Sequence, residues 1–168
     1  DFGRRFSRDD IQEPRRSIGV RKPAPADAVP ASKQHLPQRY VVLDFETTGF
    51  AANRNDRVIE IGAVEIVEGR IGRQFQMFVN PEMRIPRRSS EIHRITDFDI
   101  AEAPKASEAF PALIEFIGDA IVVAHNIRFE LEFLQSECGR LGIRPSFRTE
   151  CTLETARRLY PNLPSYKL

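Results

Sequence analysis

The chain has 168 residues, of which 41% are hydrophobic and 29% charged, and a formal net charge of +1. This composition suits one globular domain with a hydrophobic core. The sequence contains no run of eighteen apolar residues and no apolar segment at its start, which argues against a transmembrane span or a secretory signal within it. Cys138 and Cys151 form neither a metal-binding pair nor a disulfide framework, so we expect a reducing, cytoplasmic location.

Residues 1–38 differ in composition from the rest of the chain. They hold five prolines, few apolar residues and no helical or strand period, which predicts a disordered, basic, proline-rich tail or linker. Such a tail is either a plain spacer or a source of weak electrostatic affinity for nucleic acid. Residues 1–39 carry a net charge of +4, which leaves −3 for the remainder. A domain at 39–168 that acts on nucleic acid would therefore need basic patches or metal ions to approach phosphate.

A short apolar segment from Tyr40 to Phe45 leads directly into acids, threonines and a glycine. Its β-branched and aromatic residues predict a buried strand. Because side chains alternate along a strand, Asp44 and Glu46 should point the same way and raise each other's pKa. Mg²⁺ or Mn²⁺ between them would remove this repulsion, since both ions prefer hard oxygen ligands.

We therefore predict a metal site at Asp44 and Glu46, the alternative being a strand end with solvated acids. The chain then turns sharply at residues 47–49, where we expect backbone N–H groups and threonine hydroxyls to be free to meet a ligand.

The remaining segments predict three strands and four helical elements. The strands up to residue 79 form a meander through a polar loop at 50–56 and a hairpin turn at 68–70. Strands followed by an alternation of strand and helix argue for an α/β domain with a mixed sheet. The predicted elements are strands at 57–68, 71–79 and 120–124, a short helical turn through Ile92 and His93 with its N-cap at Ser89-Ser90-Glu91, and helices at 107–117, 129–141 and 152–160.

Polar residues also follow the strand at 120–124, where it gives way to a helix. His125 and Asn126 lie at this transition, which is a usual place for sites in α/β folds. Glu130 falls in the first turn of the following helix, where the helix dipole stabilises a carboxylate. Glu130 is either part of the site or an N-terminal helix charge with no further role.

Five segments in this order resemble the DEDD superfamily of 3′–5′ exonucleases, in particular its DnaQ-like, proofreading epsilon-type domains. The resemblance covers residues 39–168. It implies an RNase H-like fold, in which helices flank a mixed β-sheet, and hydrolysis with two Mg²⁺ or Mn²⁺ ions that releases nucleoside monophosphates. The segments are D-F-E-T-T-G at 44–49, V-I-E-I-G-A-V at 58–64, I-H-R-I-T at 92–96, V-A-H-N-I-R-F-E at 123–130 and A-R-R-L-Y-P at 156–161.

The resemblance also assigns roles. Asp44, Glu46 and Glu130 would be the catalytic, metal-binding acids. Several of the remaining assignments have alternatives: a solvated strand position for Glu60, a turn-fixing role for His93, a helix cap for Asn126 and a core position for Phe129. The substrate-binding candidates are Phe45, Thr47, Thr48, Gly49, Glu60, His93, His125, Asn126 and Phe129.

Three features depart from the family pattern. Glu130 stands where aspartate is usual, and its extra methylene could misplace a metal in a site that tolerates little error. Arg94 replaces the glycine of I-H-G-I-T. The last motif, a histidine followed five residues later by aspartate, is missing, because the only histidines are His35, His93 and His125. We therefore expect a fold that is incomplete at its C-terminus, in a fragment that begins with aspartate rather than methionine.

These observations favour a 3′–5′ exonuclease that acts on DNA in replication proofreading or repair. The expected partners are a single-stranded DNA 3′ end, with RNA as the alternative, and a DNA polymerase or a fused repair domain, with no membrane. One alternative is a non-catalytic relative with a degenerate metal site that binds nucleic acid or docks a partner. Another is an exoribonuclease of the same superfamily, since contacts to the 2′-OH are not visible in the sequence.

Overall fold

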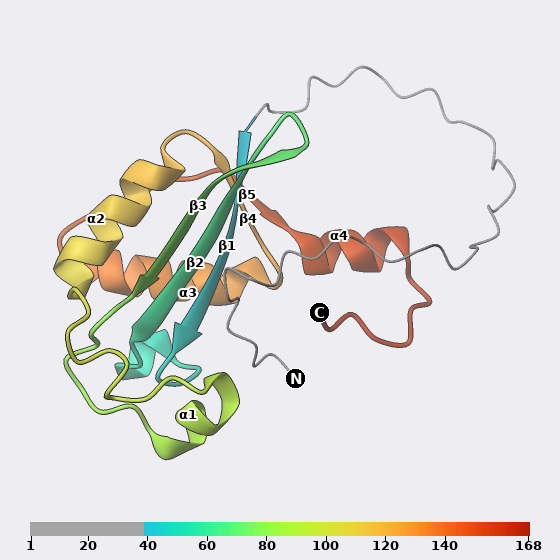
Figure 1. The fold of residues 1–168 in the computed structure, drawn as a ribbon. Helices are drawn as coiled ribbons and strands as arrows, with labels where there is room; N and C mark the ends of the chain where they lie inside the picture. Colours follow the sequence, from blue (N-terminus) through green and yellow to red (C-terminus); the bar gives the residue numbers. More distant parts are fainter. Residues whose placement is uncertain (1–38) are drawn as a thin grey trace, which may run out of the picture. The chain divides into compact units, whose positions relative to one another are not determined.

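The computed structural model describes residues 39–168, so the predicted tail at 1–38 lies outside the described residues. No helix in this described part is long and apolar enough to cross a membrane. In chain order the elements are β1 (Arg39–Thr47), the 3₁₀ helix η1 (Ala52–Arg54), β2 (Val58–Val67), β3 (Arg70–Phe78), α1 (Arg87–His93), α2 (Ala106–Ile117), β4 (Ile121–Ala124), α3 (Ile127–Arg140), β5 (Thr149–Cys151) and α4 (Thr152–Leu159) (Figure 1).

The five strands form one mixed sheet in the order β3-β2-β1-β4-β5. The first three strands are antiparallel neighbours, which confirms the predicted meander. β4 is parallel to β1, and β5 is parallel to β4. Because β1 and β4 run the same way, the polar residues that follow each strand are brought to the same edge of the sheet.

Alternate residues of β1 have different environments. Val41, Leu43 and Phe45 are buried, whereas Asp44 is exposed and Glu46 is only partly buried. The buried positions join one hydrophobic core with residues of the two longest helices, α2 and α3, which lie beside the sheet in Figure 1. These helical core residues include Phe110, Leu113 and Ile117 of α2 and Phe133, Leu134 and Cys138 of α3.

The hairpin turn between β2 and β3 matches its sequence prediction. Glu68 and Gly69 both have positive φ, at 50° and 78°, as expected of the tight turns whose twist suits a two-stranded ribbon. β5, by contrast, was not predicted. Its three residues, Thr149–Cys151, are too few to show a strand period, and they form a strand by pairing with β4.

Helix α1 begins earlier than predicted. Its N-cap position is Pro86, whose carbonyl accepts the N–H of Ser89 at 2.8 Å. The predicted cap at Ser89-Ser90-Glu91 was therefore wrong. The hydroxyl of Ser89 lies within the helix and donates to the carbonyl oxygen of Thr48 at 2.6 Å, so it is used in a tertiary contact instead of a cap.

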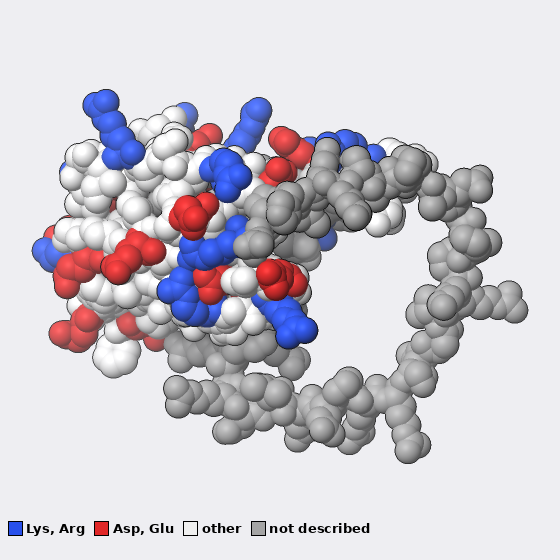
Figure 2. All heavy atoms as spheres, turned by 90° about the horizontal axis from the view of Figure 1, so that it is seen from above, with Lys and Arg blue, Asp and Glu red and all other residues white. Residues whose placement is uncertain are grey.

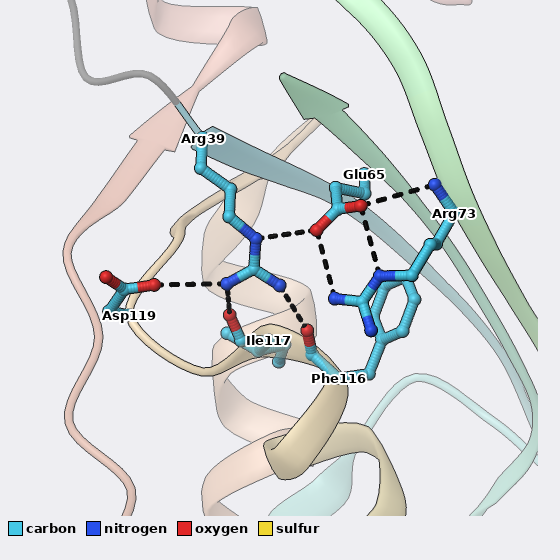
Figure 3. Close-up of polar contacts among 6 residues, drawn as sticks. All are labelled: Arg39, Glu65, Arg73, Phe116, Ile117 and Asp119. Atoms are coloured by element: carbon cyan, nitrogen blue, oxygen red, sulfur yellow. Dashed lines mark hydrogen bonds and ion pairs between the residues drawn. The ribbon is translucent and has the colours of Figure 1, made fainter.

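Three strands and one helix are joined by the Arg39 cluster, which consists of Arg39, Glu65, Arg73 and Asp119 (Figure 3). Arg39 Nε donates to Glu65 Oε1 at 2.6 Å, and Arg73 Nη2 donates to the same oxygen at 3.0 Å. The two remaining nitrogens of Arg39 donate to the last carbonyls of α2, on Phe116 and Ile117.

The Arg39 cluster thus supplies hydrogen-bond donors to the last carbonyl groups of α2, which have no partner within the helix. Hydrogen bonds from Arg73 and Arg39 lower the pKa of Glu65 to about 2. The face of the molecule drawn in Figure 2 carries acidic and basic side chains interspersed with one another.

Helix α1 ends in an unusual way for an arginine. Arg94 adopts the left-handed conformation, with φ of 66°, and its N–H donates to the carbonyl of Ser90 at 2.9 Å. This conformation favours glycine because a Cβ atom crowds the backbone there. The backbone geometry therefore explains why a glycine is expected at this position of the I-H-G-I-T pattern.

We predict that Arg94→Gly stabilises the protein. Relief of the left-handed strain is worth about 1–2 kcal/mol, and the greater freedom of glycine in the unfolded chain costs about 0.5–1 kcal/mol. The free energy of unfolding, measured in urea, should therefore rise by about 0.5–1 kcal/mol. Glu132→Gly, at an exposed position inside α3, should lower it by about 1 kcal/mol. A loss of stability in Arg94→Gly would contradict the backbone account.

Candidate active site

Two acids near the end of β1 share one face of the sheet with an acid of β2. Asp44 and Glu46 alternate with the buried core residues, and Glu46 is directly opposite Glu60 in the strand register. Like charges at opposed positions of an antiparallel pair destabilise a sheet. Burial, together with the charges of Asp44 and Glu60, raises the pKa of Glu46 to about 7. Partial desolvation also raises the pKa of Asp44.

A further acid reaches this group from helix α3. Glu130 lies in the first turn of α3, and only 3% of its surface is exposed. Burial raises its pKa to about 7; a hydrogen bond from its own backbone N–H acts in the opposite direction, and the charge of Asp44 adds to the rise. The structure thus brings Glu130 within electrostatic range of Asp44, although 86 positions separate them in the sequence.

The carboxyl group of Glu130 is incompletely satisfied. Its Oε2 atom is buried and accepts no hydrogen bond from any residue between 39 and 168. Buried polar atoms normally have a partner, and an unpaired one indicates a ligand or strain. Glu60 differs, because its Oε1 accepts from Nε2 of Gln76 on β3 at 2.8 Å. Gln76 thereby holds the fourth acid in a defined orientation beside Glu46.

The hydroxyl groups of the threonines in the turn after β1 already form hydrogen bonds within the protein. Thr47 Oγ1 donates to the carbonyl of Gly49 at 2.6 Å, and Thr48 Oγ1 accepts from the N–H of Arg57 at 2.9 Å. The N–H of Thr48 donates to the carbonyl of Arg57. The expectation that these hydroxyls are free for a ligand was therefore wrong. They hold the turn in shape, and this internal use follows from their burial.

Gly49 is required by a neighbouring side chain. A Cβ atom at this position would lie 2.3 Å from Oδ2 of Asp56. That oxygen accepts the N–H of Ala51 at 2.9 Å, and the other oxygen of Asp56 lies 3.4 Å from Thr48 Oγ1. Asp56 therefore closes the loop after β1 against its own backbone, and any larger residue at 49 would displace it.

The two histidines predicted for the site make different contacts. His93, at the end of α1, accepts the N–H of Ile95 on Nδ1 at 3.0 Å, and burial lowers its pKa. Its neutral ring therefore carries the proton on Nε2, which is buried and has no partner within the described sequence. His125 follows β4, and its Nδ1 lies 3.1 Å from Oγ1 of Thr152, the first residue of α4.

The other predicted contacts divide between core and surface. Phe45 is 4% exposed and its ring packs 6.1 Å from that of Phe110, on the side of β1 away from the acids. Phe129 packs against the core, 4.9 Å from the ring of Phe133. Asn126 occupies the N-cap position of α3 in the left-handed conformation, with φ of 67°, but its side chain makes no capping hydrogen bond.

Sequence reasoning missed residues that hold this arrangement in place. Glu137 is 1% exposed on α3 and binds the side chain of Arg57, which precedes β2. One signal was available, since a glutamate at position 137 interrupts the apolar face formed by Phe133, Leu134 and Cys138. A buried charge needs a partner, but the sequence does not show which arginine supplies it.

The donor set suits a hard divalent cation. Carboxylate oxygens are the preferred ligands of Mg²⁺ and Mn²⁺. A cation would offset the burial that raises the pKa of Asp44, Glu46 and Glu130, and the charge of Asp44 that adds to the rise in the last two. The unpartnered Oε2 of Glu130 fits the same role. Within residues 39–168, however, no group of three or more His, Cys, Asp or Glu side chains already has metal-binding spacing.

Comparison with known proteins adds independent findings. The RNase_T family, described as exonuclease, matches residues 41–168. The PolC-type DNA polymerase III of Caldanaerobacter subterraneus subsp. tengcongensis is 41% identical over 140 residues, which cover 82% of this chain and 10% of that protein. The chain therefore spans about a tenth of the length of the curated relatives that it matches.

Two solved structures show the same fold. Exonuclease X in complex with 5′ overhanging duplex DNA matches with a TM-score of 0.61 and 28% identity, covering 76% of this chain and 68% of that chain. A 3′-exonuclease that recognises the 3′ end of a histone mRNA stem-loop matches with a TM-score of 0.62 and 17% identity, covering 74% of this chain and 49% of that chain. With the strand order, these likenesses confirm the predicted α/β, RNase H-like fold.

We predict that the metal-free protein loses stability as the pH rises from about 4.5 to about 7. Glu46 and Glu130, with pKa values of about 7, keep their protons in the folded state over a range in which the unfolded chain releases them. For Glu130 the loss should be on the order of 2 kcal/mol. Urea unfolding in EDTA at several pH values measures it.

Glu130→Gln should flatten this pH dependence, because the amide does not ionise. Glu132→Gln, at an exposed position two residues further along α3, is the matched control and should leave the slope unchanged. If stability changes with pH in Glu130→Gln as steeply as in the parent, the pKa of Glu130 is not raised in the folded protein.

Proposed function

Because the chain belongs to the exonuclease family whose sequence pattern spans residues 41–168, we propose that it removes nucleotides from the 3′ end of DNA by metal-assisted hydrolysis. The observation that carries this proposal is the convergence of Asp44, Glu46 and Glu130, in which burial and the charge of Asp44 raise the pKa of both Glu46 and Glu130. Acids that repel one another at one edge of a sheet destabilise the fold, and a bound cation offsets that repulsion.

In the proposed site, Asp44, Glu46 and Glu130 would hold two Mg²⁺ or Mn²⁺ ions. Such ions supply charge stabilisation at the phosphate and lower the pKa of a bound water. Asp44 lies between the other two acids electrostatically, since its charge acts on both, so we assign it the bridging position. The main role of these carboxylates would be to bind the two ions and hold them in place.

Other residues near the acids would position the terminal nucleotide. The turn at residues 47–49 is fixed by internal hydrogen bonds and presents a rigid backbone beside Glu46. The unpartnered Nε2–H of His93 is a donor suited to a sugar or phosphate oxygen. Glu60, held by Gln76, has a second carboxylate oxygen with which to accept from a ribose hydroxyl. We assign His125 and Asn126 to the rim of the site.

DNA as substrate and a polymerase as partner are supported by the relatives. The curated relatives are PolC-type DNA polymerases, and one of the matching exonuclease structures holds duplex DNA. We propose that the domain works on a single-stranded 3′ end in replication proofreading or repair in the cytoplasm. Another matching exonuclease recognises an mRNA 3′ end, so RNA is the alternative substrate to compare.

One observation favours a second candidate function. The acids between residues 39 and 168 do not stand at metal-binding spacing in groups of three, and Glu130 replaces the aspartate that is usual in the family pattern. A relative that binds nucleic acid without cleaving it would have these features. Titration with Mn²⁺ separates the candidates, because a degenerate site should bind Mn²⁺ no better than the Asp44→Asn/Glu46→Gln double variant.

We predict that Asp44→Asn lowers the rate of mononucleotide release by about 10²–10³-fold, because it removes charge that the site needs to hold the cation. The assay follows a 3′-labelled DNA strand with the full natural protein in Mn²⁺, and an RNA strand of the same sequence alongside. Glu115→Gln, on the exposed side of α2, should retain the full rate.

Two results would count against the nuclease proposal. One is the absence of mononucleotide release under conditions in which a known exonuclease cleaves the same strand. The other is equal release by the natural protein and by Asp44→Asn, which would place the chemistry elsewhere.

A further inference from the structure

A buried ion pair joins α3 to the loop that precedes β2. Arg57 Nε donates to Glu137 Oε1 at 2.7 Å, and Arg57 Nη2 donates to Glu137 Oε2 at 2.9 Å. This two-pronged geometry fixes both the distance and the angle between the groups. Glu137 is 1% exposed, and its Oε1 also lies 3.3 Å from the N–H of Val58. We call Arg57 and Glu137 the Arg57–Glu137 clamp.

The arginine side of the clamp is tied to the turn after β1. The backbone of Arg57 exchanges two hydrogen bonds with Thr48: its N–H donates to Thr48 Oγ1, and its carbonyl accepts the N–H of Thr48, both at 2.9 Å. Arg57 Nη1 further donates to the carbonyl of Pro81 at 3.2 Å. A shift of the Arg57 side chain is therefore transmitted to the residues that directly follow Glu46.

The glutamate side of the clamp is tied to the site through the helix. Glu137 follows Glu130 by seven residues, so the two lie about two turns apart on the same side of α3. A helix is stiff over this length, so the position of Glu137 sets that of Glu130. Ser136 adds a second link, since its hydroxyl donates to the carbonyl of Ala52 in η1 at 3.3 Å.

We propose that the Arg57–Glu137 clamp is a positioning device that sets the separation between the β1 acids and Glu130. The inference rests on the proposed function, in which these acids hold divalent ions together. Neither clamp residue is assigned a contact with substrate or metal, so each is a positioning residue. The sheet supplies Asp44 and Glu46, the helix supplies Glu130, and the clamp is the buried ionic contact that joins the helix to the loop after β1.

The Arg39 cluster provides a matched control. It also joins a helix to the sheet through an arginine and a buried glutamate (Figure 3). It lies at the first residue of β1, however, whereas Asp44 and Glu46 lie near the last. Arg57→Lys and Arg39→Lys each keep the positive charge and lose the planar fork. Both changes weaken an anchored helix, but only the first should disturb the acids.

The first readout is the affinity of the whole 168-residue chain for Mn²⁺, followed by the paramagnetic broadening of water protons. Loss of an outer group that orients metal ligands typically costs 10–100-fold in metal affinity. We expect Arg57→Lys to bind Mn²⁺ about tenfold more weakly and Arg39→Lys to bind it as the parent does. Circular dichroism verifies that each variant is folded, and Glu137→Gln replaces Arg57→Lys if the latter is not.

The second readout needs no metal. The backbone amide of Glu130, followed by ¹H–¹⁵N NMR in EDTA, reports the position of the first turn of α3. Its chemical shift should change in Arg57→Lys, together with that of Thr48, because the helix and the turn after β1 are then no longer held together by the clamp. Arg39→Lys should leave both signals unchanged.

The two readouts separate the outcomes. If the parent does not bind Mn²⁺, the metal site of the proposed function fails, while the amide signals of Glu130 and Thr48 still decide the role of the clamp. The clamp proposal is overturned if both signals in a folded Arg57→Lys or Glu137→Gln variant stay where they are in the parent. It is also overturned if Arg39→Lys changes Glu130 equally, since that result would indicate only a general loosening of the fold.

Discussion

Partial burial of neighbouring carboxylates, together with the repulsion between their charges, is the constraint on which the candidate site depends. Asp44, Glu46 and Glu60 share one face of the sheet, and Glu130 approaches from a helix. Partial burial of several acids beside one another opposes folding, because each charge is poorly hydrated and faces others of its own sign. The fold must therefore hold these groups by interactions made elsewhere, and the raised pKa values of Glu46 and Glu130 reflect their burial first and the neighbouring charges second.

Those interactions lie mainly on the opposite side of β1 and at the ends of helices. Val41, Leu43 and Phe45 anchor the strand in the core, which leaves the alternate positions to carry the acids. Two buried glutamates that play no part in the acid group, Glu65 and Glu137, each bind two arginines and fasten a helix to the sheet or its loops. The described residues thus include acids paired with arginine in structural roles and, at the candidate site, acids that form no ion pair with another residue between 39 and 168.

Much of this arrangement was predictable from local sequence. The period of two in β1 places Asp44 and Glu46 on one face, and the polar residues between β4 and α3 indicate the same edge of the sheet. What local patterns could not supply is pairing over long separations. Thr48 was expected to face a ligand, but it bonds to Arg57, and Arg57 pairs with Glu137, which lies 80 residues further along. The strand β5 and the start of α1 were missed for the same reason, since tertiary contacts define them.

The exchange of aspartate for Glu130 is best understood together with the position of α3. The extra methylene extends the carboxylate by one carbon–carbon bond, so the same oxygen position requires a helix set slightly further away. That distance is determined by what holds the helix, which is the hydrophobic core on one side and the contact of Glu137 with Arg57 on the other. The effect of the longer side chain at position 130 therefore depends on where α3 is held. A glutamate here does not by itself mark a degenerate site, because the same chain that carries the longer acid also carries the ion pair that sets its reach.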